Sequence, residues 1–349
     1  MRAFIVPLLT FGLVYVAVAA EPRYTYVNVI GVLGGVGADD GDGAVARFWT
    51  PIGISTDSAG NVYVADFDVN RAAGPGQVVV FDDSGRLLRV VDVAGSSNLL
   101  LGLDFHRFGS RASDVELLVI DFGAKNVLRV DPVTGASTIF TTIPGGAAAG
   151  PNALTFDPAG NVYISDSFQG IIWQTAPTGG AATVWTQSPL LTTTGVPPFG
   201  ANGLAFNRSH TVLFVANTGN DTIVKVPVAT RTAEVFTNSI NGADGLAIDE
   251  HDNIWVCANQ ADEIVVVDQS GRAIAKLGDF DGLSQDGAPV GLLFPASLVF
   301  RGGFVYVTNL SLDLRLFGFN AVDSQWAAAV QRHTVARLPM HLPPIRGLR

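Results

Sequence analysis

The chain has 349 residues, a formal net charge of −10, 39 glycines and one cysteine, and only 15% of its residues are charged. This composition excludes a disordered chain, a disulfide scaffold and a cysteine-based zinc cluster. The acidic balance argues against nucleic-acid binding, which needs clustered Lys and Arg side chains. Because Gly weakens helices and serves tight turns, the Gly content indicates many short strands.

The first twenty residues have the pattern of a secretory signal peptide. Arg2 precedes an apolar run, and Ala17–Ala19 has the small-x-small form of a cleavage site. The alternative is a membrane anchor, but the run is about 17 residues long, shorter than the ~20 that a span needs, and Pro7 interrupts it. We therefore predict a signal peptide over residues 1–20, export to the periplasm or the cell exterior, and no membrane span in the mature chain.

One pattern then recurs six times at intervals of 42 to 52 residues. A short apolar run is followed by a polar turn, often Asp-x-x-Gly-Asn, and by an alternating run that ends in Asp or Asn. Two further strand-like runs follow in each of the first five copies, for example Gln77–Phe81 and Leu87–Val93 in the first. Four strands in a repeat of this length predict an all-β fold, a six-bladed β-propeller with four-stranded antiparallel blades around a central channel.

The sixth copy contains the strand-like runs Phe304–Leu310 and Leu314–Gly318 but no clear fourth strand. We expect Tyr24–Leu33 to supply the outer strand of this blade, because pairing the two ends of the chain closes the ring. A closure through Gln331–Leu338 is the alternative. The prediction is a single propeller domain over residues 21–338, followed by a loosely held tail over residues 339–349.

The residues that begin the six copies should form a ring near one mouth of the channel. They are Ile52, Leu101, Asn152, Asn202, Asp244 and Ala296. Three consecutive blades therefore present amide or carboxylate oxygens, which are hard ligands that suit Ca²⁺ or another divalent cation. Asn-Gly and Asp-Gly are also turn signals, and a structural turn is the alternative. The apolar residues at the same phase of the other blades show that the backbone does not require Asn or Asp there.

At these residues the sequence resembles the six-bladed regucalcin, gluconolactonase and luciferin-regenerating-enzyme family. The likeness is clearest over Gly242–Asn259 and extends over roughly residues 45–315. The resemblance implies a catalytic divalent metal, usually Ca²⁺, at the top of the channel, held here by Asn152, Asn202 and Asp244.

The family has a further metal ligand, a Glu at the first-blade position, and this chain has Ile52 there. That departure removes one negative charge and one oxygen ligand from the implied site. Asp39, Asp40 and Asp42 in the preceding loop are candidates to replace it, and a solvated acidic loop is the alternative.

The function that this resemblance implies is metal-dependent hydrolysis of a lactone or related ester. Asp244 is the candidate catalytic residue, because its carboxylate is the only titratable group in the ring and can accept a proton. Asn152 and Asn202 are candidates for binding the carbonyl side of the substrate. Ser297, beside the sixth ring position, is a further candidate substrate-binding residue, and a turn hydroxyl is the alternative.

A second resemblance favours another function. Gly31–Phe48 and Asp57–Asp66 are similar to an NHL repeat, and NHL propellers often bind partners without catalysis. The alternative prediction is therefore a non-catalytic propeller that binds a protein or a small molecule, and Ile52 favours it. We expect other polar residues to be structural: Asp121 caps a turn, and His106 lies in a surface turn.

Overall fold

The computed structural model describes residues 27–30, 48, 50–68, 74–111, 113–320 and 323–342, the first range by its backbone only. The predicted signal peptide lies outside these residues, so export stays a prediction. Within the described part of the chain, no helix has the length and apolar character needed to cross a membrane.

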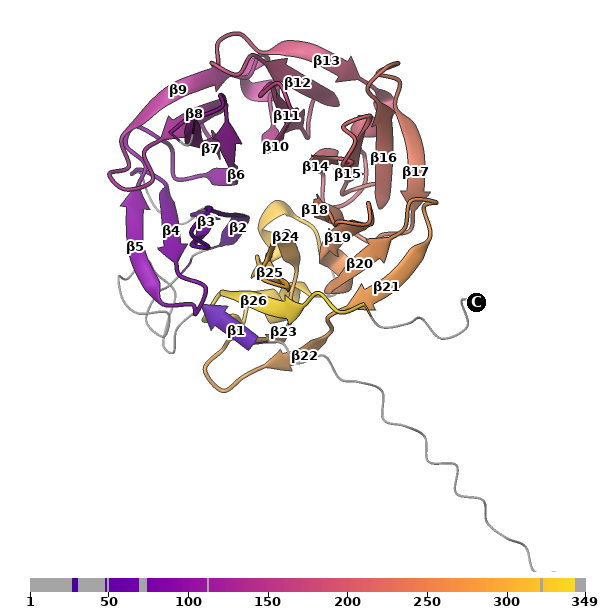
Figure 1. Ribbon diagram of the computed structural model, residues 1–349. Helices are drawn as coiled ribbons and strands as arrows, with labels where there is room; N and C mark the ends of the chain where they lie inside the picture. Colours follow the sequence, from indigo (N-terminus) through magenta and orange to yellow (C-terminus); the bar gives the residue numbers. More distant parts are fainter. Residues whose placement is uncertain are drawn as a thin grey trace, which may run out of the picture.

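Six four-stranded antiparallel sheets surround a central channel (Figure 1). This arrangement confirms the predicted six-bladed propeller. We number the blades along the chain and give their strands from the channel outward. Blade 1 contains β2 (Pro51–Thr56), β3 (Val62–Asp66), β4 (Gln77–Phe81) and β5 (Leu87–Asp92). Blade 2 contains β6 (Leu100–Arg107), β7 (Val115–Asp121), β8 (Asn126–Val130) and β9 (Ser137–Thr142).

The next three blades repeat this order. Blade 3 contains β10 (Pro151–Phe156), β11 (Val162–Asp166), β12 (Ile171–Thr175) and β13 (Thr183–Gln187). Blade 4 contains β14 (Ala201–Phe206), β15 (Val212–Asn217), β16 (Thr222–Pro227) and β17 (Glu234–Asn238). Blade 5 contains β18 (Ala243–Ile248), β19 (Ile254–Ala258), β20 (Glu263–Val267) and β21 (Ala273–Leu277).

Blade 6 joins the two ends of the chain. It contains β24 (Pro295–Arg301), β25 (Phe304–Asn309), β26 (Thr334–Pro339) and, on its outer edge, β1 (Val27–Ile30). The structure therefore uses both segments that the sequence offered as alternatives for closing the ring, one as the third strand and the other as the fourth.

The expected strand over Leu314–Gly318 is wrong. Leu314–Phe317 forms a short 3₁₀ helix, η4, and the Asp313 side chain accepts a hydrogen bond from the Arg315 backbone at its start. A capped turn of this kind competes with extended backbone.

The other elements outside the blades are short. They are η1 (Gly146–Ala148), η2 (Pro189–Leu191), η3 (Asn259–Ala261), α1 (Ser324–Ala327) and the hairpin of β22 (Phe280–Leu283) and β23 (Pro289–Gly291).

The recurring Asp-x-x-Gly-Asn turns set where the second strand of a blade begins. In blade 1 the Asn61 backbone N–H donates to Asp57 Oδ1 at 2.9 Å, and in blade 3 Asn161 donates to Asp157 in the same way at 2.9 Å. Gly60 has a φ of +95°, a conformation that only Gly adopts freely. Each turn therefore reverses the chain between the two innermost strands of its blade.

Apolar side chains fill the spaces between neighbouring blades. Six buried clusters each combine residues of two adjacent blades. At the closing interface, Tyr306 and Val335 of blade 6 pack with Val64 and Phe81 of blade 1. Each blade thus buries both of its faces, and the core is a closed circle of interfaces.

His106 does not lie in a surface turn as predicted. β6 continues to Arg107, so His106 is still on the strand, and its side chain is fully buried. Its Nε2 lies 2.7 Å from the Gly160 carbonyl oxygen of blade 3, and its Nδ1 lies 3.0 Å from Glu116 Oε1. This histidine therefore links two blades and takes no part in the channel.

Acid should weaken blade 6 through His333, which directly precedes β26. Burial lowers the pKa of His333 to about 4, from 6.5. The unfolded chain then binds more protons than the folded one between these values, so stability is present above about pH 6.5 and is lost as the pH falls toward 4. Replacing His333 by Gln should remove up to about 3 kcal/mol of this pH dependence. Urea unfolding between pH 7 and 4.5 measures it.

His251→Gln is the matched control, because His251 is exposed. If the wild type and His333→Gln lost stability equally on acidification, burial of His333 would not be the cause.

Candidate functional site

The six ring residues occupy the same place in the fold, the second residue of each innermost strand. Directly after this residue the pairing with the second strand shifts register in all six blades, for example between Pro151 and Leu154. Such a bulge re-aims the side chain at that point of the strand. Asn152, Asn202 and Asp244 line one central cavity of about 400 Å³.

A polar partner from the same blade holds each of the three oxygen-bearing residues. Asn152 Nδ2 donates to Ser167 Oγ at 3.1 Å, and the Ser167 hydroxyl donates to the Ala201 carbonyl oxygen at 2.7 Å. Because the hydroxyl proton is used there, Ser167 must accept from Asn152, which fixes the orientation of the amide. Asn202 Nδ2 likewise donates to Thr218 Oγ1 at 2.9 Å. Both amide nitrogens thereby make hydrogen bonds within their own blades. The amide oxygens are left to bind a cation or to accept a hydrogen bond in the cavity.

Asp244 is a buried carboxyl whose pKa is shifted by no Lys, Arg or His side chain. The histidine that lines the same cavity, His210, has its Nδ1 3.2 Å from the Arg208 carbonyl oxygen. Burial raises its pKa to about 7, against hydrogen bonds from Asn259, Asn202 and the Gly245 backbone. Asn259 Nδ2 donates to its Oδ2 at 3.0 Å. A cation in the cavity would stabilise the ionised form. The described residues contain no cluster of three His, Cys, Asp or Glu side chains, so amide oxygens must supply part of any ligand set.

Across the channel the ring is apolar. Ile52 packs with Leu101 in one buried cluster and with Ala296 in another. Position 52 therefore offers no oxygen to a cation, and its surroundings are hydrocarbon. The acidic loop residues Asp39, Asp40 and Asp42 lie outside the described residues, and their part in the site stays a prediction.

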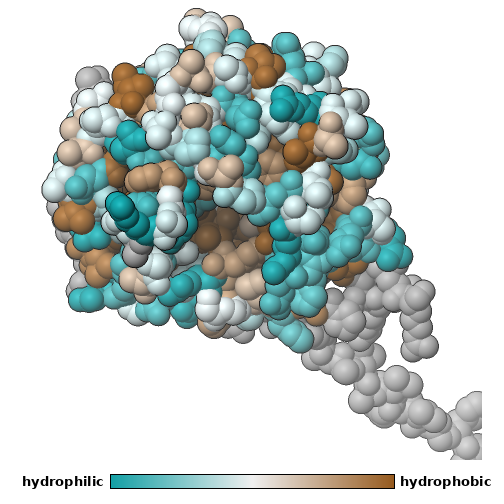
Figure 2. Space-filling model, turned by 45° about the horizontal axis from the view of Figure 1, so that its top comes forward, coloured by the Kyte–Doolittle hydropathy of each residue, from teal (hydrophilic) through white to brown (hydrophobic). Residues whose placement is uncertain are grey.

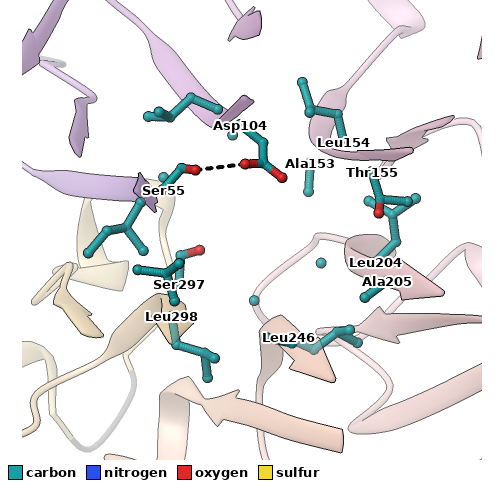
Figure 3. Close-up of a pocket in the computed structure, with 18 of the residues that line it drawn as sticks. Ser55, Asp104, Ala153, Leu154, Thr155, Leu204, Ala205, Leu246, Ser297 and Leu298 are labelled. Carbon is teal, nitrogen blue, oxygen red and sulfur yellow. Dashed lines mark hydrogen bonds between the residues drawn. The ribbon is translucent and has the colours of Figure 1, made fainter. Parts of the chain in front are cut away.

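The sequence reasoning missed a second carboxyl in the channel. The Ser55 hydroxyl donates to Asp104 Oδ1 at 2.6 Å (Figure 3). The Phe105 backbone N–H donates to the same oxygen at 2.7 Å. Burial raises the pKa of Asp104. The aligned repeats contain the signal: the fifth residue of each inner strand faces the channel, and only blade 2 has an acid there.

Ser297 lines the same cavity, and its part in substrate binding stays a prediction (Figure 3). Its backbone N–H donates to Thr308 Oγ1 at 3.0 Å. A methyl group at Gly245 would lie 3.1 Å from Ser297 Oγ, so this hydroxyl lies beside the residue that follows Asp244. No described hydrogen bond engages the Ser297 hydroxyl as a donor, which leaves it free to contact a ligand.

Comparisons with known proteins agree with the fold and the family resemblance. Residues 110–278 match the sequence model of the family described as SMP-30/Gluconolactonase/LRE-like region. This segment contains Asn152, Asn202 and Asp244, but neither Ile52 nor Ala296. The resemblance inferred from the repeats is thereby confirmed. No curated protein sequence matches the chain.

Solved structures with the same fold include two enzymes and a calcium-binding protein. A luciferin-regenerating enzyme has a TM-score of 0.61 at 15% identity, over 90% of this chain and 98% of that one. A calcium-binding regucalcin from Agrobacterium tumefaciens has 0.58 at 16%, over 92% and 100%. A gluconolactonase from Xanthomonas campestris has 0.57 at 15%, over 84% and 86%. At these identities the similarity establishes the fold and not the activity.

Close backbone approach should make the ring intolerant of a methyl group between Asn202 and Asp244. A Cβ at Gly203 would lie 2.6 Å from the Asp244 carbonyl oxygen and 2.7 Å from the Gly245 Cα. We expect Gly203→Ala to lower the free energy of unfolding by about 1–3 kcal/mol, because neighbouring backbones must move apart. Chemical denaturation measures this loss.

Ala153→Gly at the equivalent position of blade 3 is the matched control, with an expected cost of about 0.5–1 kcal/mol from backbone entropy alone. Equal stability of Gly203→Ala and the wild type would show that the inner strands can separate freely.

Proposed function

We propose that this gluconolactonase-like propeller binds a divalent cation, Ca²⁺ first of all, through Asn152, Asn202 and Asp244 and hydrolyses a lactone or related ester at the channel mouth. The observation that carries the proposal is that consecutive blades bring two amides, Asn152 and Asn202, and the buried carboxyl of Asp244 to one cavity, and that no basic side chain shifts the pKa of this carboxyl. The match over residues 110–278 and the fold shared with a regucalcin and a gluconolactonase support it.

The donor set fits a calcium ion. Ca²⁺ takes six to eight oxygen ligands and accepts amide, carboxylate, backbone carbonyl and water oxygens. Two amides and one carboxylate leave positions for water and a substrate carbonyl. When bound, the cation would polarise the carbonyl and lower the pKa of a water molecule.

The residues of the chain would orient the substrate and transfer the proton. Ser167 and Thr218 fix the amide side chains of Asn152 and Asn202 by hydrogen bonds. The groups that would bind the carbonyl side of the substrate are therefore already oriented before the substrate arrives. Asp244 accepts the proton that water releases as its oxygen forms a bond to the carbonyl carbon. The ester C–O bond then breaks, and the leaving oxygen takes up that proton from Asp244, which returns the carboxylate to its ionised form. Without a cation the pKa of Asp244 is raised to about 7, and a bound cation would favour the ionised form, so the carboxylate is available to accept this proton near neutral pH.

Ile52 favours a second candidate function, the binding of a partner without catalysis. An apolar residue at the first-blade position weakens a calcium site, and a non-catalytic propeller that binds a partner through the same mouth would not need the missing carboxylate. Calcium binding and lactone turnover separate the two functions.

Calcium should raise the melting temperature of the wild type, and more so at high pH. The folded-state pKa of Asp244 is raised from 3.8 to about 7, so stability gained by holding a proton there is lost as the pH rises through 7. Ca²⁺ binds the ionised form, so its apparent affinity should fall up to about tenfold per pH unit below 7. We expect a larger calcium-induced shift at pH 8 than at pH 5.5, measured by thermal unfolding.

Asp244→Asn should abolish both the shift and its pH dependence. Asp92→Asn, an exposed acid on outer strand β5, should retain both. A calcium shift that survives in Asp244→Asn would place the ion elsewhere.

Ile52→Glu should strengthen calcium binding. The substitution adds a carboxylate on the cavity wall opposite the three oxygen donors, and we expect the Kd to fall by at least about tenfold at pH 8, or ~1.4 kcal/mol. Isothermal titration calorimetry measures the Kd independently of any stability lost with the Ile52 packing. Ile52→Gln, of similar size and neutral, is the control. A folded Ile52→Glu variant with unchanged calcium affinity would show that this position does not face the ion.

A further inference from the structure

We infer that the substrate carries an apolar group next to its lactone or ester carbonyl, and that a polyhydroxylated lactone is a poor substrate. The inference rests on the proposed function, because it concerns the same mouth of the channel. Its basis is a division of that mouth into a polar half and an apolar half.

The division extends over two layers of residues. In blades 3, 4 and 5 the ring residue is Asn or Asp, and the residue after the second strand is Ser167, Thr218 or Asn259. In blades 1, 2 and 6 the ring residue is Ile52, Leu101 or Ala296, and the residue after the second strand is Phe67, Phe122 or Leu310. Each polar ring residue thus has a polar partner, and each apolar ring residue has an apolar one.

Aromatic rings continue the apolar half across the mouth. Phe67 and Phe122 have ring centroids 6.1 Å apart, Phe122 and Phe168 5.9 Å, and Phe168 and Phe199 5.6 Å. Phe67 and Phe122 pack against the same cluster as Ile52. Phe168 is 44% exposed, whereas Phe67, Phe122 and Phe199 are half-buried. We call these four residues the aromatic arc.

The arc does not line the cavity itself, but Phe67 and Phe122 pack in one cluster with Ile52, which does, so the arc continues the apolar surface beyond the cavity wall. A carbonyl bound by Asn152, Asn202 and Asp244 directs the rest of the molecule either along the channel or across the mouth toward the arc. Figure 2 shows a hollow at the centre of one face with hydrophobic residues on its walls. Burial of a methylene there is worth about a fourfold gain in binding.

A sugar-derived lactone would bind the apolar half poorly. Its hydroxyl groups need hydrogen-bond partners once water is removed, and Ile52, Leu101, Ala296 and the arc supply none. The carboxyl on that side of the channel, Asp104, lies three residues further along its strand than Leu101, and its Oδ1 already accepts two hydrogen bonds. The Ser297 hydroxyl and Asp104 Oδ2 are the two side-chain groups on that side without a described hydrogen bond, fewer than the hydroxyl groups of a sugar lactone. The apolar half therefore still disfavours a polyhydroxylated ring and favours an alkyl or aryl substituent.

The test compares γ-lactones of increasing alkyl length, from γ-butyrolactone to γ-nonalactone, with D-glucono-1,5-lactone at saturating Ca²⁺. We expect kcat/KM to rise about two- to fourfold per methylene and to exceed that for the glucono-lactone at least about tenfold with γ-nonalactone. Phe168→Ser should reduce this dependence on length. Val133→Ser, at an exposed apolar residue in the turn between β8 and β9, should retain it.

Binding of the same lactones, measured by calorimetry on the calcium-loaded protein, separates the two ideas. If no lactone is hydrolysed but γ-nonalactone binds more tightly than the glucono-lactone and Phe168→Ser weakens it, the proposed hydrolysis fails and the apolar preference stands. If the glucono-lactone is the better substrate or the tighter ligand, the apolar preference is overturned while hydrolysis stands or falls on its own rate. Binding of γ-nonalactone that is no tighter than that of γ-butyrolactone also overturns it.

Discussion

The burial of both faces of every blade is the constraint on which the rest of the structure depends. Each apolar cluster lies between two blades, so no blade can bury its faces unless both neighbours are present. The ring must close, and the chain closes it by placing β1 beside β26 in blade 6. Thr308 adds a polar link at this junction, where its hydroxyl donates to the Ile52 carbonyl oxygen at 2.8 Å.

Closure of the ring also creates the site. Six innermost strands converge on one axis, and glycine at the third position of most of them lets adjacent backbones approach closely. The second-position residues are about fifty residues apart in the sequence, and all of them except Leu101 then line one cavity. The burial that stabilises the ring is the same burial that raises the pKa of Asp244 and makes its carboxyl a candidate for a cation.

The segment that matches the family model includes the three blades that contain Asn152, Asn202 and Asp244, blades 3, 4 and 5. The matched segment, residues 110–278, contains the three oxygen-bearing ring residues, whereas the apolar ring residues Ile52, Leu101 and Ala296 lie outside it. The ring therefore combines a polar set inside the matched segment with an apolar set outside it. A difference of this kind alters what a shared fold binds, because the fold places residues and the residues determine the chemistry.

The repeat alone determined the fold class, the number of blades and the phase of the ring, because a blade repeats a local pattern of strands and turns that periodicity reveals. The sequence did not determine closure of blade 6, because Leu314–Gly318 has strand-like composition and only the Asp313 cap and the competing pairing of β26 decided against it. The burial of His106 was beyond local reasoning, because it depends on Gly160 of the neighbouring blade, about fifty residues away. Asp104 was within reach of the aligned repeats, since it is the acid at the fifth position of an inner strand. Only the tertiary structure decided that the second-position residues form a mouth with one polar and one apolar side, because only the closed ring brings the six positions around one axis.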